Sequence, residues 1–395
     1  MKIPRFLAVL WLLLSLQPAI AQHRLPGWAM GGFVRPEGVN PVISPDSLVK
    51  FWCPMRGDSV AWESNDTFNP AAAVKDGRIV LLYRAEDKSG VGIGFRTSRL
   101  GHAESSDGIT FDRMRTPVLF PGPDSQQVNE YPGGCEDPRV AVTPDGLYVM
   151  LYTQWNRKVA RLGVATSRDL VHWQKHGPAF AKAFNGKFVE RWSKSASLVT
   201  EVADGKQVIS KINGRYFMYW GENGVYGAWS DNLTDWEPVV DTVGELKAFI
   251  RPRNGYFDSD LTECGPPAIK TASGILLLYN GKNKSGPNRD PRFNANAYCA
   301  GQVLFDAADP TRPIARLDVP FLRPMAPFEK SGQYRDGTVF IEGMAFLGGK
   351  WYLYYGCADS RVGVAIYDPA QPGVADPVPE APGSPLVIFG LQNPL

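Results

Sequence analysis

Five short apolar runs, each reaching a tyrosine, dominate the pattern of hydrophobic and polar positions along the chain. They are "RIVLLYRAED", "GLYVMLYTQW", "GRYFMYWGEN", "GILLLYNGKN" and "KWYLYYGCAD", and their tyrosines are Tyr83, Tyr152, Tyr219, Tyr279 and Tyr354. Each run follows a turn signal, such as Asp76-Gly77 or Asn213-Gly214. Short apolar runs beside such turns predict β-hairpins, and helical periodicity is scarcely visible.

A second apolar run precedes each turn and a further strand-like segment follows, so one unit recurs about every 60 to 75 residues. Five repeated antiparallel units predict an all-β fold, a five-bladed β-propeller, with a two-sheet sandwich as the alternative. No linker is visible, so residues 22–395 are expected to form a single catalytic domain. The segment from His23 to about Asp66 is expected to pack across the blades or complete the last one.

The first residues, "MKIPRFLAVLWLLLSLQPAIAQ", have the pattern of a secretory signal peptide. Lys2 and Arg5 precede an apolar core from Phe6 to Leu16, and Ala19-Ile20-Ala21 is a small-x-small cleavage pattern. We therefore predict a signal peptide over residues 1–21 and export to the periplasm or the medium.

Composition excludes several classes of partner. The chain carries 42 Lys and Arg residues against 40 Asp and Glu residues, a net charge of +2 with no basic stripe, so nucleic acid is not expected as a partner. After the leader no segment has the roughly 20 apolar residues of a membrane helix, so no membrane insertion is expected. The five cysteines lie far apart, and we expect no metal site and no cofactor. The oligomeric state stays open.

The starts of the predicted inner strands carry polar residues. In a propeller these starts converge on one end of the central channel, so sequence-distant residues there form one cluster. Alignment of the five units on their turns places at these starts Asn69, Asp137, Lys194, Gly265 and Glu342, with Glu136 and Glu263 just ahead. A second ring follows the repeated tyrosines and contains Arg84, Trp155, Glu222, Lys282 and Asp359.

A polar cavity with several carboxylates, an arginine and aromatic rings suits a sugar ligand. Carboxylates in such a cavity indicate glycosyl transfer, since one acid must protonate the leaving oxygen and a second carboxylate must activate a nucleophile or be one. Crowding of Glu136, Asp137, Glu222 and Glu263 is expected to raise at least one of their pKa values, while Arg139 holds another carboxylate ionised.

Six strings in order resemble glycoside hydrolase family 130, whose members are five-bladed propellers acting on β-mannosides. They are "FNPA", "YRAED", "GCEDPR", "GPPAI", "LLYNG" and "YYGCAD", and the resemblance spans Phe68 to Tyr367. It implies that Asp137 is the general acid, acting through a hydroxyl of the bound mannose. It further implies that Asn69, Arg84 and Asp359 bind that mannose, that Arg139 orients the acid or contacts the sugar, and that Tyr83 is structural.

Most members of that family are phosphorylases, and this sequence departs from their pattern. Asn280 stands where phosphorylases carry a histidine, and Glu222 and Glu263 bring negative charge to where phosphate would bind. The two glutamates resemble those of the hydrolytic branch, which removes β-1,2-linked mannose. We therefore expect an exo-acting, inverting β-mannosidase that hydrolyses β-mannoside oligosaccharides, with Glu222 or Glu263 as the base. The ten residues expected to form the site are the catalytic Asp137, Glu222 and Glu263 and the substrate-binding Asn69, Arg84, Glu136, Arg139, Lys194, Asn280 and Asp359.

Two alternatives remain open. Lys194 could serve phosphate in a β-mannoside phosphorylase, although a sugar phosphate made outside the cytoplasm would conserve no energy for the cell. A non-catalytic carbohydrate-binding propeller is the other reading, and displacement of the carboxylates from the cavity would favour it.

Overall fold

The computed structural model describes residues 24–371 and 373–379. The predicted signal peptide, residues 1–21, lies outside this range. The described chain is almost entirely β-structure, and its helices are short: α1 (Gln127–Glu130) and the 3-10 turns η1 (Ala183–Gly186) and η2 (Pro327–Glu329). Within these residues no helix is long and apolar enough to cross a membrane.

The strands fall into five sequence-consecutive groups after an isolated hairpin, β1 (Phe51–Cys53) and β2 (Asp58–Val60). The first group is β3 (Asp66–Lys75), β4 (Arg78–Glu86), β5 (Ser98–Ser105) and β6 (Asp112–Arg113). The second is β7 (Gly134–Val142), β8 (Tyr148–Trp155), β9 (Ala160–Ser167) and β10 (Gln174–Pro178). The third is β11 (Ala196–Ala203), β12 (Lys206–Ile209), β13 (Lys211–Ile212), β14 (Arg215–Trp220), β15 (Tyr226–Ser230) and β16 (Glu237–Pro238).

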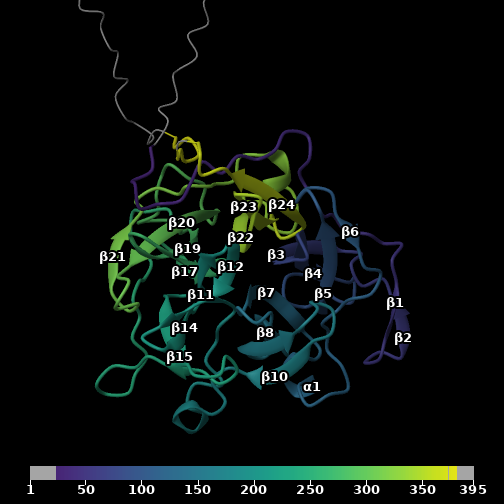
Figure 1. Ribbon diagram of the computed structural model, residues 1–395. Coiled ribbons are helices and arrows are strands. Elements are labelled where there is room, and N and C mark those ends of the chain that lie inside the picture. Colours follow the sequence, from purple (N-terminus) through teal and green to yellow (C-terminus); the bar gives the residue numbers. More distant parts are fainter. Residues whose placement is uncertain (1–23, 372, 380–395) are drawn as a thin grey trace, which may run out of the picture.

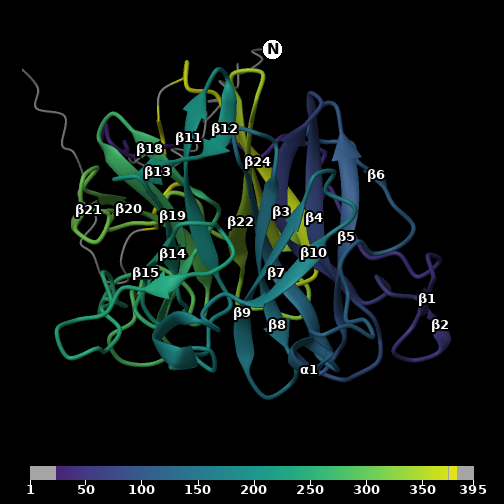
Figure 2. The ribbon, with the colours of Figure 1, turned by 60° about the horizontal axis from the view of Figure 1, so that its bottom comes forward.

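The last two groups complete the sheet structure. The fourth is β17 (Leu261–Cys264), β18 (Ala268–Thr271), β19 (Gly274–Lys282), β20 (Tyr298–Phe305) and β21 (Pro313–Arg316). The fifth is β22 (Val339–Leu347), β23 (Lys350–Cys357) and β24 (Arg361–Tyr367). In Figure 1 the strands β3, β7, β11, β12 and β22 lie nearest the middle of the molecule. Figure 2 shows the long strands of the first two groups running side by side.

Strand pairing confirms the all-β prediction without dividing the sheets into five separate blades. The described strands form sheets of two, eight, eleven and three strands. Parallel pairing of Ser98 with Gly134 joins the first group to the second, and parallel pairing of β11 with β18 joins the third to the fourth. The observed architecture is therefore a set of curled sheets.

The apolar core is distributed between neighbouring groups. Five buried clusters occur in the described chain, and each combines side chains from two groups that follow one another, with the fifth group packing on the first. Ala71 and Ala73 enter the cluster shared with the second group, whereas Ala72 enters the cluster shared with the fifth. Because successive side chains of a strand point to opposite faces, both faces are buried and the strands read as continuous apolar runs.

The repeated tyrosines are structural, as predicted for Tyr83. All five are fully buried. Each hydroxyl donates a hydrogen bond to one acceptor, at 2.6–3.0 Å: Glu63 for Tyr83, Glu130 for Tyr152, the Pro310 carbonyl for Tyr219, Asp258 for Tyr279 and the Gly108 carbonyl for Tyr354. A buried tyrosine needs such a partner, so the repeat reflects one packing solution used five times.

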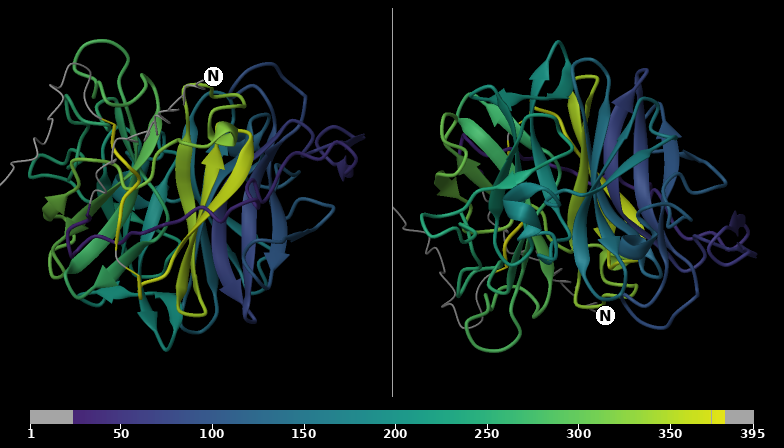
Figure 3. Two further views of the ribbon diagram at one scale, coloured as in Figure 1. Left: turned by 90° about the horizontal axis from the view of Figure 1, so that it is seen from above. Right: turned by 90° about the horizontal axis from the view of Figure 1, so that it is seen from below.

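The segment before β3 flanks the last strand group, which confirms the expectation that it completes that group. Antiparallel bridges join Val34 to Ile366 and Ile43 to Val362 of β24. The Asn40 side chain adds hydrogen bonds of 2.9 and 2.8 Å to the backbone of Val364. Figure 3 shows this purple segment running across the yellow-green strands. The outer edge of β24 is therefore covered rather than left open.

Gly101 in β5 tests the packing around the repeated tyrosine. A Cβ added there would lie 2.3 Å from the Tyr83 ring. We expect Gly101→Ala to lower the free energy of unfolding by about 1–3 kcal/mol through overpacking. The matched control is Gly27→Ala, whose Cβ meets nothing within 4 Å. Thermal unfolding measures both, and equal melting temperatures would contradict the packing described here.

Candidate active site

A cavity of about 160 Å³ opens where the inner strands begin. Seven of the ten residues predicted for the site line it: Asn69, Arg84, Asp137, Lys194, Glu222, Glu263 and Asp359. They come from all five strand groups, so residues up to 290 positions apart in the sequence share one small volume. The carboxylates are therefore not displaced from the cavity, which removes the observation that would have favoured a purely carbohydrate-binding protein.

β-Bulges aim the side chains at the starts of three inner strands. The pairing register shifts around Asn69 in β3, around Asp137 in β7 and around Glu342 in β22, which are equivalent positions in the predicted alignment. Asn69 and Asp137 have φ values of 45° and 47°. Asn and Asp tolerate this left-handed region better than most residues, and bulges often lie beside active sites. The local backbone thus explains why these residue types occupy these positions.

Asp137 lies at the centre of a buried network of charges. Its Oδ1 accepts hydrogen bonds of 2.9 Å from Asn69 Nδ2 and from Arg84 Nη1. Lys194 Nζ lies 3.5 Å from Asp137 Oδ2 and 3.3 Å from Glu136 Oε2. Arg84 also pairs with Glu86 at 2.6 Å and with Glu136 at 2.8 Å. Both cations of the cavity are therefore already paired with carboxylates.

The network corrects the expected charge state of Asp137. Burial acts to raise the pKa of Asp137, but Arg84, Lys194 and Arg139 outweigh it and hold the pKa below its ordinary value. These cations therefore favour the ionised form of Asp137 over the protonated form that a general acid needs. The sequence pattern identified the nearby cations but not their combined effect on this carboxyl.

Protons are instead favoured on other carboxyls of the cluster. Burial raises the pKa of Glu263, and the negative charge of Glu222 raises it further. Burial also raises the pKa of Asp359 to about 7, where Arg84 opposes and Asp137 reinforces the shift. The pKa of Glu136 is raised, chiefly by burial against the pull of Arg84 and Lys194. The expectation that crowding raises at least one pKa is confirmed.

Glu222 and Glu263 occupy different environments within the cavity. Glu263, in β17, is 3% exposed. Glu222 follows β14 and is partly exposed. The indole N–H of Trp192 donates a hydrogen bond of 2.7 Å to Glu222 Oε2. Glu263 thus belongs to the interior of the cavity and Glu222 to its mouth.

Glu136 and Arg139 do not line the cavity and support it from behind. Glu136 is buried and accepts hydrogen bonds from Arg84 and Ser98. Arg139 Nη1 donates to the backbone carbonyl of Asp137 at 2.9 Å and lies 3.0 Å from Glu342. Of the two roles predicted for Arg139, its contact with the Asp137 backbone fits orienting the acid, and Arg139 does not line the cavity.

Asn280 was predicted to bind the ligand, but the structure places it outside the cavity lining. Its side chain is fully buried in β19. The amide N–H donates to the Ile341 carbonyl at 3.0 Å, and the amide oxygen accepts from the Ile341 N–H at 2.8 Å. Asn280 therefore links β19 to β22, and both polar atoms of its amide already have backbone partners.

Other members of the two predicted rings also lie outside the cavity lining. Trp155 Nε1 donates to the Gly94 carbonyl at 3.0 Å, and Lys282 pairs with Asp260 at 3.1 Å. Glu342 is buried against Arg139, and the Gly265 carbonyl accepts a hydrogen bond from Ser197. Loop lengths differ among the groups, so a fixed offset from the tyrosine does not always reach the cavity.

Sequence reasoning missed several lining residues, among them Glu86, Tyr298, Gln333 and Tyr334. Glu86 lies two positions after Arg84 on the same face of β4, and this period-two spacing was a usable signal. Gln333 and Tyr334 lie on the loop before β22 and belong to no repeated pattern. Only the three-dimensional structure brings them to the site.

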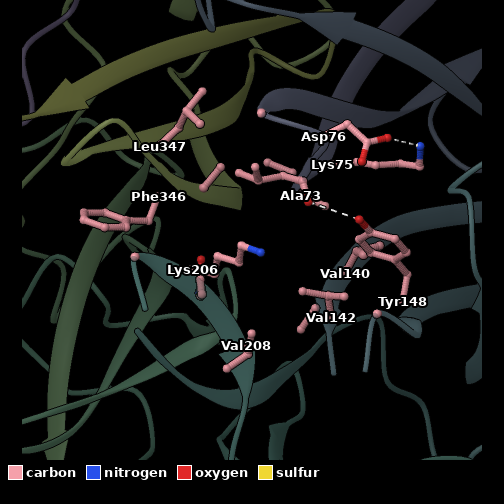
Figure 4. Close-up of a pocket in the computed structure, with 18 of the residues that line it drawn as sticks. Ala73, Lys75, Asp76, Val140, Val142, Tyr148, Lys206, Val208, Phe346 and Leu347 are labelled. Carbon is pink, nitrogen blue, oxygen red and sulfur yellow. Dashed lines mark hydrogen bonds and ion pairs between the residues drawn. The ribbon is translucent and has the colours of Figure 1, made fainter. Parts of the chain in front are cut away.

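A second cavity, of about 440 Å³, lies at the opposite ends of the same inner strands (Figure 4). Its walls are mainly apolar, with Val140 and Phe346 among them. Asp76 there is paired with Lys75 at 2.6 Å. This cavity has no cluster of carboxylates comparable to that around Asp137, so the smaller cavity is the candidate active site.

Comparison with known proteins identifies the family. Residues 54–370 match a family model described as β-1,4-mannooligosaccharide phosphorylase, of glycoside hydrolase family 130. A 1,2-β-oligomannan phosphorylase from Thermoanaerobacter sp. is 34% identical over 314 residues, covering 78% of this chain and 91% of that protein. The chain belongs to glycoside hydrolase family 130.

Two solved structures are also similar to this chain. A glycosyl hydrolase from Bacteroides ovatus is 66% identical, with a TM-score of 0.89 over 91% of this chain and 99% of that one. Another structure is 65% identical, with a TM-score of 0.90 over 91% and 100% of the two chains. It is described by the statement that this family of mannoside phosphorylases contains glycoside hydrolases that target β-1,2-mannosidic linkages in Candida mannan.

The raised pKa of Asp359 predicts a pH-dependent cost in stability. A carboxyl with a folded pKa of about 7 stabilises the fold fully below its unfolded pKa, near 4, and loses this contribution as the pH rises through 7. We expect the melting temperature of Asp359→Asn, relative to the wild type, to rise by about 2–4 °C between pH 5 and pH 8.

Asp58→Asn, on the short strand β2, controls for the loss of one exposed charge. Thermal unfolding at both pH values makes the comparison. A difference between Asp359→Asn and the wild type that does not change with pH would contradict the assigned pKa.

Proposed function

We propose that this member of family 130 is an exo-acting, inverting β-mannosidase that releases β-1,2-linked mannose by hydrolysis. The observation that carries the proposal is the charge of the cavity. Among the lining residues in the described chain, Arg84 and Lys194 face five carboxylates, and both cations are already paired. A phosphate dianion would be repelled by about a few kcal/mol for each nearby carboxylate at an effective dielectric constant of about 20. Water meets no such repulsion.

Asp137 remains the proposed donor to the leaving oxygen. Because the surrounding cations favour the ionised form of Asp137, its proton must come from neighbouring carboxyls of the cavity when substrate binds. Asp359, with its pKa of about 7, holds such a proton below neutral pH. Interacting carboxyls titrate as a group, so the proton belongs to the cluster rather than to one residue. A mannose hydroxyl between Asp137 and the leaving oxygen would complete the transfer.

Glu263 is the proposed base. It is buried in the cavity, and its raised pKa makes its carboxylate a stronger base. Glu222 contributes to that raised pKa through its charge. In the proposed reaction Glu263 takes a proton from water, the water oxygen bonds to the anomeric carbon, and the bond to the leaving oxygen breaks as that oxygen is protonated. The product is α-mannose.

Phosphorolysis is the second candidate, and the names of relatives favour it. The Thermoanaerobacter relative is a phosphorylase, and Lys194 lies in the cavity. Against it stands the pairing of Lys194 with Glu136 and Asp137 at 3.3 and 3.5 Å. Export, which we propose from residues 1–21, also fits hydrolysis better, because hydrolysis consumes no inorganic phosphate.

We also propose that the five strand groups form a five-bladed propeller. Support comes from the five buried clusters, each shared by neighbouring groups, with the fifth group packing on the first. The bridges between residues 34–43 and β24 complete the outer edge of the last group. This arrangement accounts for one cavity at the starts of the inner strands and another at their ends.

Substitution of the two glutamates tests the mechanism. We expect Glu263→Gln to lose about 100-fold or more of the hydrolysis of β-1,2-mannobiose and to be partly rescued by azide, which needs no base. Glu222→Gln is expected to keep measurable turnover. Removal of its charge lowers the pKa of Glu263, so the loss of activity at acid pH should move to lower pH.

Asp137→Asn serves as the control, because azide cannot replace a proton donor for a sugar leaving group. Initial rates with and without azide, across the pH range, give the comparison. Azide rescue of Glu222→Gln in place of Glu263→Gln would exchange the two proposed roles, and rescue of neither would reject the assignment of a glutamate base.

A further inference from the structure

A large aromatic side chain stands exposed at the mouth of the cavity without an assigned role. Trp192 is 46% exposed. Its indole N–H is held by Glu222, which lines the cavity. Exposure of so large an apolar ring beside a ligand cavity is typical of a binding surface.

Neighbouring apolar residues extend this surface. The loop after β4 exposes Val91, Ile93 and Phe95 by 92%, 55% and 60%, and Ile93 also lines the cavity. Trp155 connects the loop to Trp192: its N–H donates to the Gly94 carbonyl, and its ring meets the Trp192 ring edge-on at 5.4 Å. Beside this contact Trp192 keeps 46% of its surface exposed.

The size of the cavity determines what lies on this surface. Ligand pockets usually measure about 300–1,000 Å³, so a cavity of about 160 Å³ holds a single sugar ring. An oligosaccharide whose terminal mannose fills the cavity must place its next sugar at the mouth. There an exposed indole face matches the apolar face of a sugar, while Glu222 accepts hydrogen bonds from its hydroxyls.

We propose that Trp192, with Ile93 on the facing loop, forms the subsite for the leaving-group sugar. This inference rests on the proposed function, because it assumes a mannoside with its terminal residue in the cavity. In an inverting reaction the base and the leaving group lie on opposite faces of the sugar. The Trp192–Glu222 hydrogen bond therefore assigns Glu222 to the leaving-group side and leaves Glu263 on the side of the water.

The test compares two substrates that differ only in the leaving group. β-1,2-Mannobiose places a sugar on Trp192, whereas β-mannosyl fluoride leaves the subsite empty. We expect Trp192→Ala to lower kcat/KM for the disaccharide about tenfold or more, with less than a threefold change for the fluoride, each at the variant's optimal pH. Trp192→Phe, which keeps an aromatic ring but loses the N–H, should recover most of the activity on the disaccharide.

Trp52→Ala is the matched control, because Trp52 is 66% exposed but lies on β1, outside the cavity. Ile93→Ser, on the facing loop, is a second variant and is expected to show the same selective loss. It keeps the test available if Trp192→Ala does not fold. Equal losses on both substrates would overturn the subsite while leaving the proposed function intact. Wild-type protein inactive on both substrates would reject the proposed function and the subsite together.

Discussion

The buried pairing of Asp137 with Arg84 and Lys194 is the constraint on which the site depends. Charges removed from water are tolerated only when they are paired and hydrogen-bonded. Here Arg84 reaches three carboxylates, and the Asp137 carboxylate accepts from both Arg84 and Asn69. These partners come from β3, β4 and β7, so the strands must hold fixed positions for the charges to be satisfied. The all-β scaffold and the chemistry of the cavity are therefore parts of one arrangement.

The proposal of hydrolysis rests on the same network. A phosphorylase needs cations that are free to meet a dianion, and paired cations attract a second anion weakly. In the described chain the positive charge of the cavity is already matched to Asp137, Glu136 and Glu86. Burial raises the pKa of Glu263, and the negative charge of Glu222 raises it further. The family contains both phosphorylases and hydrolases, so family membership does not choose between the two reactions. The proposal therefore rests on the charges around this cavity.

Much of the fold could be predicted from the sequence, because its signals are local. Apolar runs beside turns identified the hairpins, and the repeated tyrosines identified equivalent positions in the strand groups. Bulges at Asn69, Asp137 and Glu342 confirm that alignment in three groups. What the alignment could not give was the way the groups join, since the pairing of β5 with β7 and of β11 with β18 depends on long-range contacts.

Part of the site could also be predicted, because some of its residues belong to the local repeat. Residues at strand starts, such as Asp137 and Glu263, follow from the repeat. Asn280 has the expected position of the repeat in β19, but it does not line the cavity because its amide hydrogen-bonds to the Ile341 backbone. Trp192 and Gln333 lie on loops outside the repeat. The charge state of Asp137 is a balance between burial and three cations, which no sequence pattern reports.

The most direct measurement follows the products formed from β-1,2-mannobiose in phosphate buffer by proton and phosphorus NMR. The account predicts that α-mannose appears first, at a rate that does not depend on phosphate, and that no mannose phosphate accumulates. Formation of α-mannose 1-phosphate, at a rate that rises with phosphate concentration, would contradict the central claim that the paired cations of this cavity leave water as the nucleophile.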